Sequence, residues 1–308
     1  MGTDDVGGGT VPLRQQAIGG ALLSVWQRIP EGASVFLGGS YGTTRETLTS
    51  DLDVFVIGEG GDYESYLARL QSHRIVDVET LSSSAFRIVR SQVENFVPDF
   101  SAELPSAPYD ELRFLVRSLL GQIVQDCHLG DTTQLVEGAR LVLAARAAAF
   151  YCNIFQDIYG LWCSGRYDDV VVRAGEITQW ACMLALCQSQ LVDPAPKWAP
   201  TLACADSLQV GRAAQRLMQH LSQFRDGTGQ HWTMTLLHRT NAVVAAAQLA
   251  ARHKVVDAGA RLGSAASDYW SDPSICLIGV PGYLAVMDVR EQTVTIGNEP
   301  LLSCMVIP

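Results

Sequence analysis

Apolar and polar positions alternate along the first part of the chain in a way that predicts short strands between helices. Helical spacing of apolar residues predicts a helix over 11–27, and an apolar run predicts a buried strand over 34–37. Acidic residues alternating with apolar ones predict strands over 51–57 and 74–81, and the segment between them predicts a short helix over 63–72. A mixed sheet with flanking helices follows from this order of elements.

After Gly130 the pattern changes to apolar residues at helical spacing, which predicts a bundle of about four helices. A helix over 112–120 and a strand over 122–125 precede this change. The bundle helices are expected around 141–155 and over 167–191, 207–224 and 231–254. The tail predicts strands over 275–280, 283–288 and 294–296. The predicted fold class is therefore α+β, with domains over 1–130 and 131–270 and a short β-rich tail over 271–308.

Composition and charge narrow the function classes. The chain has 308 residues, 48% of them hydrophobic and 18% charged, which excludes a largely disordered protein. Its formal net charge of −10 and the absence of a Lys/Arg run disfavour a polynucleotide partner and favour a small substrate. None of the eight cysteines forms a CxxC pair, which argues against zinc. Arg146 and Asp157 interrupt the apolar stretch 141–162, so we expect no membrane span and a cytoplasmic protein.

Two acidic pairs are the main candidates for chemistry. Asp51 and Asp53 alternate with apolar residues, so they share one face of their strand, roughly 7 Å apart. Asp77 and Glu79 do the same on the next predicted strand. Neighbouring carboxylates repel, and a divalent cation between them relieves the repulsion; oxygen ligands suit Mg²⁺. Asp77 or Glu79 could complete a site for two ions, although an Asp-x-Asp pair is also common on a solvated outer face.

A small-residue turn lies ten residues upstream of the first acidic pair. Gly38, Gly39 and Ser40 follow the strand at 34–37, and small residues there let backbone N–H groups approach a phosphate. Arg45 could neutralise phosphate charge from the following loop, or could be a solvated arginine. The alternative for the glycines is a plain turn.

These motifs resemble those of the DNA polymerase beta-like nucleotidyltransferase superfamily. Leu37-Gly38-Gly39-Ser40 followed by Asp51-Leu52-Asp53-Val54 is similar to its pattern, and Val76-Asp77-Val78 fits its third acidic position best. The similarity is closest to the kanamycin-type aminoglycoside nucleotidyltransferases, which join such a domain to a helical one. The spacing between Gly-Ser and Asp, the stretch 76–82 and the strand at 123–126 support this likeness.

The resemblance implies transfer of a nucleoside monophosphate, with AMP from ATP expected, to a hydroxyl of a small aminoglycoside-like or other natural-product acceptor. Asp51, Asp53 and Asp77 or Glu79 would bind two Mg²⁺ ions, and Gly38, Gly39 and Ser40 the triphosphate. Asp157 is the candidate base on the first long helix; the alternatives are an exposed helix charge or a buried ion pair. Lys197, beside Trp198, could contact phosphates or lie on the surface.

The same residues are compatible with other functions. The chain could be an inactive nucleotide- or ligand-binding protein, or an enzyme that modifies tRNA or protein, although its acidity disfavours tRNA. A negative net charge suits a cationic acceptor. The strands of the tail could pair within the chain or with a second subunit, which would give a homodimer.

Overall fold

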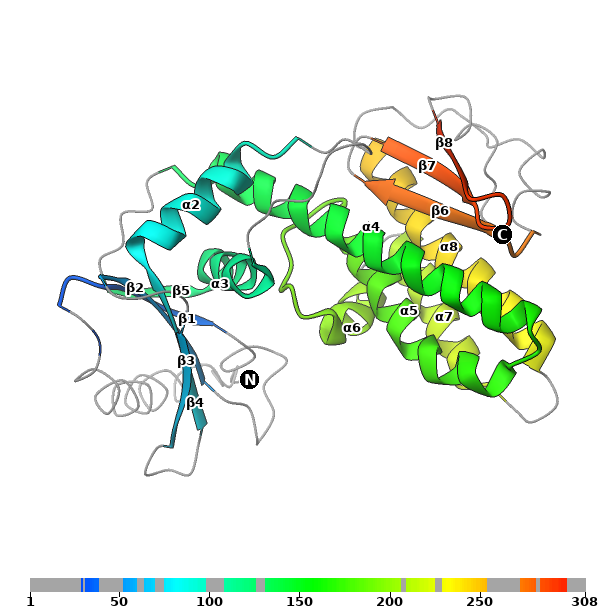
Figure 1. Ribbon diagram of the computed structural model, residues 1–308, viewed down its shortest axis with the longest axis horizontal. Coiled ribbons are helices and arrows are strands. Elements are labelled where there is room, and N and C mark those ends of the chain that lie inside the picture. The colour runs from blue at the N-terminus through cyan, green and yellow to red at the C-terminus, as the bar shows by residue number, and fades with distance from the viewer. Residues whose placement is uncertain are drawn as a thin grey trace, which may run out of the picture. The chain divides into compact units, whose positions relative to one another are not determined.

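The computed structural model (Figure 1) describes eleven parts of the chain. These are residues 29, 31–38, 52–59, 64–69, 75–97, 108–125, 131–205, 209–224, 229–253, 272–280 and 283–297. The helix expected over 11–27 lies outside them.

The chain divides into two compact units. The first comprises residues 1–93 and 107–135, and the second comprises 94–106 and 136–308. The β-rich tail, expected as a separate part, is grouped with the helices of the second unit.

A five-stranded mixed sheet forms the first unit, with the order β3-β4-β2-β1-β5. Its strands are β1 (Ser34–Gly38), β2 (Leu52–Gly58), β3 (Glu64–Arg69), β4 (Ile75–Ser82) and β5 (Gln122–Gln125). β2 and β4 are parallel, and the other neighbours are antiparallel. The α+β class with a mixed sheet is thus confirmed.

The prediction of a helix over 63–72 is wrong, because residues 64–69 form strand β3. This strand pairs antiparallel with β4 along its whole length and closes one edge of the sheet. Six residues gain a full row of backbone hydrogen bonds from that pairing, which outweighs the weak helix propensity of so short a segment.

The two faces of the sheet bear different kinds of side chain. One face is aliphatic, and its buried members, with Ala33 and Leu52, form a single cluster: Val35, Leu37, Val54, Val56, Val76 and Val78. The other face bears Phe36, Phe55 and Glu79, which are register neighbours. Helix α3 (Tyr109–Leu120) packs on this second face, and α2 (Ser83–Glu94) leads away from the end of β4.

The helices of the second unit match the predicted bundle. They are α4 (Thr133–Cys163), which begins in the first unit, α5 (Tyr167–Cys187), η1 (Pro196–Trp198), α6 (Ala199–Cys204), α7 (Gln209–Leu221) and α8 (Gly229–His253). α8 packs against α5 and α7. Arg140 of α4 donates to the carbonyl oxygens of Cys187 and Gln188, and so caps the end of α5.

Three antiparallel strands complete the second unit in the order β6-β7-β8. They are β6 (Ile275–Val280), β7 (Tyr283–Asp288) and β8 (Thr293–Gly297). Buried Asn241 of α8 fastens β6: its Nδ2 donates to the Ile275 carbonyl at 2.7 Å, and its Oδ1 accepts from the Leu277 N–H at 2.9 Å. These bonds explain why the tail belongs with the helices.

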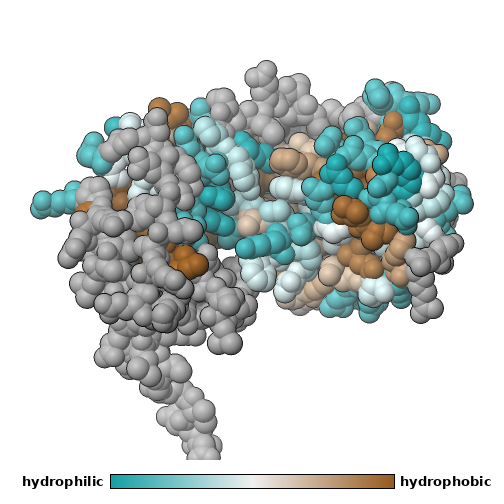
Figure 2. All heavy atoms as spheres, turned by 60° about the horizontal axis from the view of Figure 1, so that its bottom comes forward, coloured by the Kyte–Doolittle hydropathy of each residue, from teal (hydrophilic) through white to brown (hydrophobic). Residues whose placement is uncertain are grey.

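Among the described helices, α5 alone has the length and apolar composition of a membrane span. Most of that apolar stretch, 61%, is buried inside the second unit, as in a core helix. Exposed apolar side chains on this unit include Phe150, Val172 and Met218. Figure 2 shows small brown clusters among the hydrophilic side chains of its surface.

Candidate active site

Asp53 and Asp77 lie side by side on the first unit's sheet. They are register partners on the parallel strands β2 and β4, so their side chains leave the same face from backbones about 4.8 Å apart. Each is near the beginning of its strand. Asp53 is buried, with 8% of its surface exposed, and Asp77 is half-buried. Two acidic residues 24 positions apart therefore meet at the same end of two adjacent interior strands.

The end of β1 meets the same place. Gly38, the last residue of β1, is the register partner of Asp53 across the antiparallel pair. The chain therefore leaves the sheet at Gly38, next to the acidic pair. Gly39, Ser40, Arg45 and Asp51 themselves lie outside the described residues, and their positions stay predictions.

Glu79 has a different environment from Asp77, although both lie on the same face of β4. Its side chain is 1% exposed, and its two carboxylate oxygens each accept from a different arginine of α3. Arg113 Nη2 lies 3.3 Å from Oε2, and Arg117 Nη1 lies 3.3 Å from Oε1. From the sequence, either Asp77 or Glu79 could be the third carboxylate. In the structure Asp77 lies beside Asp53, whereas Glu79 forms ion pairs with two arginines of α3.

The two arginines were not identified from the sequence. They are four residues apart on a predicted helix and therefore lie on one face of it, which is the signal that could have drawn attention to them. Their partner, Glu79, is 34 and 38 residues away, a distance over which helix periodicity carries no information.

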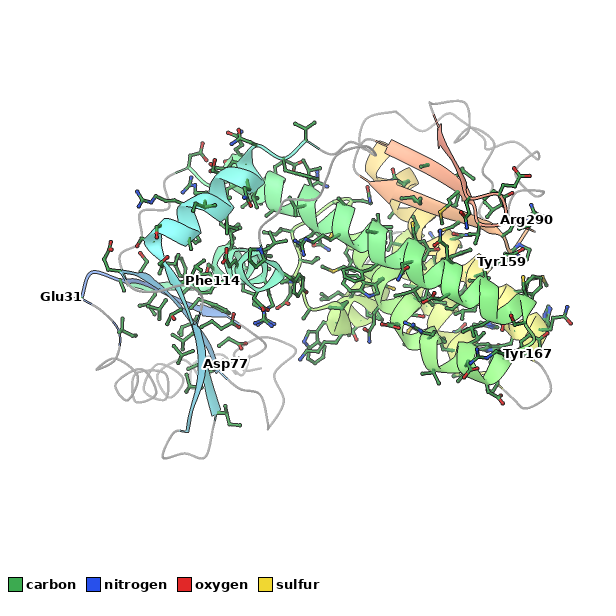
Figure 3. The ribbon with its side chains drawn as sticks, in the orientation of Figure 1. Glu31, Asp77, Phe114, Tyr159, Tyr167 and Arg290 are labelled. Atoms are coloured by element: carbon green, nitrogen blue, oxygen red, sulfur yellow. The ribbon has the colours of Figure 1, made fainter. Side chains whose placement is uncertain are left out.

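An aromatic contact fixes α3 to the sheet beside this cluster. The rings of Phe55 and Phe114 meet edge to face, with centroids 5.5 Å apart. Figure 3 labels Phe114 on α3 and Asp77 on the sheet. The acidic pair, the buried ion pairs and this aromatic contact belong to the same face of one sheet.

The candidate base Asp157 lies in the second unit. It is exposed on α4 and pairs with Arg173 of α5 at 3.2 Å. Arg173 also pairs with Glu176 at 2.8 Å, and these carboxylates raise the pKa of its guanidinium, Glu176 more than Asp157. The ion pair is therefore exposed rather than buried; a catalytic role for Asp157 stays a prediction.

Lys197 is exposed in η1. Its Nζ lies 5.7 Å from the centre of the Trp198 ring, within range of a weak cation–π contact. A phosphate contact through this lysine also stays a prediction.

The donor set of the acidic pair fits Mg²⁺. Within the described residues no group of three or more His, Cys, Asp or Glu is placed to hold a metal ion. Mg²⁺ is commonly bound by one or two carboxylates together with substrate phosphates and water, however. Asp53 and Asp77 supply two such carboxylates, and Asp51 directly precedes β2 in the sequence.

Comparison with known proteins agrees with this geometry. Residues 21–103 match the family model of the nucleotidyltransferase domain. Most of the matched stretch, residues 21–93, lies in the first unit and includes Asp53 and Asp77.

The remaining comparisons give no information about the substrate. No protein of curated function matches the chain. The solved structures that resemble it include a nucleotidyltransferase-like protein from Exiguobacterium sibiricum, with a TM-score of 0.39 and 15% identity over 82% of each chain. A likeness at this level carries no argument about the site.

Proposed function

We propose that the protein transfers a nucleoside monophosphate from an NTP, with ATP as the expected donor, to a hydroxyl of a small acceptor. The single observation that supports this most strongly is the pairing of Asp53 with Asp77 at the end of β1, inside a nucleotidyltransferase domain.

In this proposal Asp51, Asp53 and Asp77 would hold two Mg²⁺ ions. Bound Mg²⁺ would offset negative charge on the triphosphate and favour loss of the proton from the acceptor hydroxyl. Backbone N–H groups at Gly39 and Ser40 would donate to the phosphate oxygens, with Arg45 and Lys197 as further cations.

At the α-phosphorus, the reaction forms one bond and breaks one bond. The acceptor oxygen attacks the α-phosphorus, the bond from that phosphorus to the bridging oxygen breaks, and pyrophosphate leaves with the electron pair. The hydroxyl proton passes to a base; the family resemblance suggests Asp157 for this role, whereas its exposed ion pair with Arg173 favours a surface charge without a role in the reaction.

A cationic natural product, such as an aminoglycoside, is the acceptor class that the formal net charge of −10 favours. Carboxylates attract such compounds from solution, and the attraction weakens with salt. The observed charge does not depend on the family resemblance, so it supports the acceptor class separately.

The test is release of pyrophosphate from each of the four NTPs with a panel of aminoglycosides and neutral hydroxylated compounds. We expect release that requires Mg²⁺ and one acceptor class, and a fall of at least about a hundredfold in Asp53→Asn. Asp168→Asn, which removes an exposed carboxylate of α5, is the matched control and should be unaffected.

Wild-type turnover in Asp53→Asn would overturn the proposal. Binding of ATP by calorimetry with no pyrophosphate release on any acceptor would instead favour an inactive nucleotide-binding protein.

A further inference from the structure

Helices α7 and α8 of the second unit carry arginine and histidine but no acidic residue. Asp and Glu together number 32 in the chain, and none of them falls within Gln209–Leu221 or Gly229–His253. The two helices pack against each other (Figure 1). They therefore form a positively charged part of a protein whose net charge is negative.

Three residues that can donate hydrogen bonds lie along one side of α8. His231, Thr235 and Arg239 are spaced four residues apart, so each is one helical turn from the next. His231 is exposed, and the other two are half-buried. This side of α8 is therefore accessible to a ligand from solvent.

His220 of α7 faces the same part of α8. Its Nε2 lies 2.8 Å from the carbonyl oxygen of Trp232, and Nε1 of Trp232 donates to the His220 carbonyl oxygen at 3.1 Å. Burial lowers the pKa of His220 most, and the charges of Arg239 and His231 lower it further. Both of the charges that act on this imidazole are positive, so cationic groups gather where the two helices meet.

The guanidinium of Arg239 lacks a partner from the chain. Its Nε is buried without a hydrogen-bond acceptor, and within the described residues it forms no ion pair. On neighbouring α5, the carboxylates of Asp169 and Glu176 pair with Arg166 and Arg173 instead. A buried donor of a charged group that has no acceptor is destabilising. An anion bound from solution would supply the acceptor.

We propose that Arg239, together with Thr235 and His231, binds a phosphate group, either free inorganic phosphate or the phosphate of a phosphomonoester. Nε and one Nη of an arginine donate in parallel to two oxygens of a phosphate. The remaining phosphate oxygens would accept from the Thr235 hydroxyl and the His231 ring, whereas a carboxylate has only two oxygens to offer. This site lies in the second unit and goes beyond the nucleotidyl transfer proposed for the first.

Thermal unfolding of the whole chain tests the proposal in buffers of matched ionic strength that contain chloride, inorganic phosphate or glycerol phosphate. An anion that binds the folded state raises the melting temperature. We expect such a rise for wild type and its loss in Arg239→Met, which removes the buried donor without adding a polar group. In chloride, Arg239→Met should be at least as stable as wild type, because the unpaired donor is gone.

Calorimetric titration with the same two phosphates gives the affinities. We expect Arg239→Met to weaken both by about tenfold or more, and Arg239→Lys to lie between it and wild type. Arg166→Met, an exposed arginine paired with Asp169, is the matched control and should change affinity less than about twofold. Asp53→Asn should leave the affinity unchanged, which separates this site from the acidic pair of the first unit.

An equal phosphate response in wild type and Arg239→Met, or no response in wild type, would overturn the inference. An equal loss of stability of Arg239→Met in chloride and in phosphate would also overturn it, because Arg239 would then be structural only. Tighter binding of glycerol phosphate than of inorganic phosphate would support a phosphorylated ligand, and the reverse order would support free phosphate. None of these outcomes requires nucleotidyl transfer, so failure here leaves the proposed function intact.

Discussion

The ring of Phe55 occupies the space into which a side chain at Gly38 would project. A Cβ built on Gly38 would lie 2.7 Å from Cε2 of that ring, well inside van der Waals contact. The ring cannot withdraw easily, because its neighbour Phe114 is fully buried against it. Packing alone therefore requires glycine at the end of β1, whether or not the residues after it bind a ligand.

Gly38→Ala should for this reason destabilise the first unit, by about 1–3 kcal/mol. The added methyl group forces the Phe55 ring away from Phe114 and displaces the strand end beside Asp53, so we also expect slower nucleotidyl transfer. Urea unfolding and initial rates of pyrophosphate release measure the two effects.

Gly175→Ala is the control, because a Cβ at this exposed position of α5 meets nothing within 4 Å. There alanine should be neutral or stabilising by up to about 1 kcal/mol. The double variant Gly38→Ala/Phe55→Leu should regain part of the lost stability. A Gly38→Ala protein as stable as wild type would contradict the packing argument.

Asp77→Asn and Glu79→Gln should fail in different ways. Asp77→Asn should fold normally, lose nucleotidyl transfer, and lose the rise in melting temperature that Mg²⁺ gives the wild-type protein by binding the folded state. Glu79→Gln should lose about 3 kcal/mol of stability, because two partly buried arginines lose their common carboxylate. Thermal unfolding with and without Mg²⁺ distinguishes the two, and a Mg²⁺ response lost only in Glu79→Gln would reverse their roles.

Periodicity predicted most of the fold because most elements bury one face. The bundle helices, β6 and β7 are long or strongly patterned, and the bounds of α5, α7, α8, β6 and β7 agree closely with the structure, whereas α4 extends well beyond the expected 141–155 at both ends. β3 was mistaken for a helix because an edge strand depends on its partner, β4, rather than on its own sequence.

The candidate site was predictable only where neighbours in sequence share a face. Spacing alone placed Asp77 and Glu79 on one side of a strand, but it could not decide between them. The distinction arises from Arg113 and Arg117, which reach Glu79 from a helix more than thirty residues away. The register of β2 against β4, which brings Asp53 to Asp77, likewise depends on pairing across the sheet.

Asp157→Asn should lower stability by less than about 1 kcal/mol, because Asp157 and Arg173 form an exposed pair with 43% and 41% of their side chains accessible. We expect kcat to stay within about twofold of wild type, as for a surface pair, and Arg173→Gln to behave alike. Steady-state kinetics with the identified acceptor provides the measurement. A fall in kcat of about a hundredfold or more in Asp157→Asn alone would assign it as the general base.

Asn241→Ala should release the tail from the helices. The change leaves the Ile275 carbonyl and the Leu277 N–H without the Asn241 side chain, and the Tyr151 hydroxyl, which donates to Asn241 Oδ1 at 2.8 Å, keeps Thr240 Oγ1 at 3.3 Å as a partner. We expect a loss of about 2–3 kcal/mol and faster proteolysis within 272–297. Tyr151→Phe, which removes one hydroxyl and leaves both bonds to β6, should cost about 1 kcal/mol and leave proteolysis unchanged; equal proteolysis of the two variants would contradict this role of Asn241.

Stability of the second unit should fall with acidification through His220. Burial lowers the pKa of this imidazole, and the positive charges of Arg239 and His231 lower it further, against the hydrogen bond to the Trp232 carbonyl, which raises it. As the pH falls below about 6.5, the unfolded chain takes up a proton that the folded state still excludes, so the free energy of unfolding decreases until the lower folded pKa is reached. His220→Gln should flatten the change in unfolding free energy between pH 7.5 and pH 5.5. Urea unfolding at the two pH values measures this difference, and an unchanged slope in His220→Gln would place the acid sensitivity elsewhere.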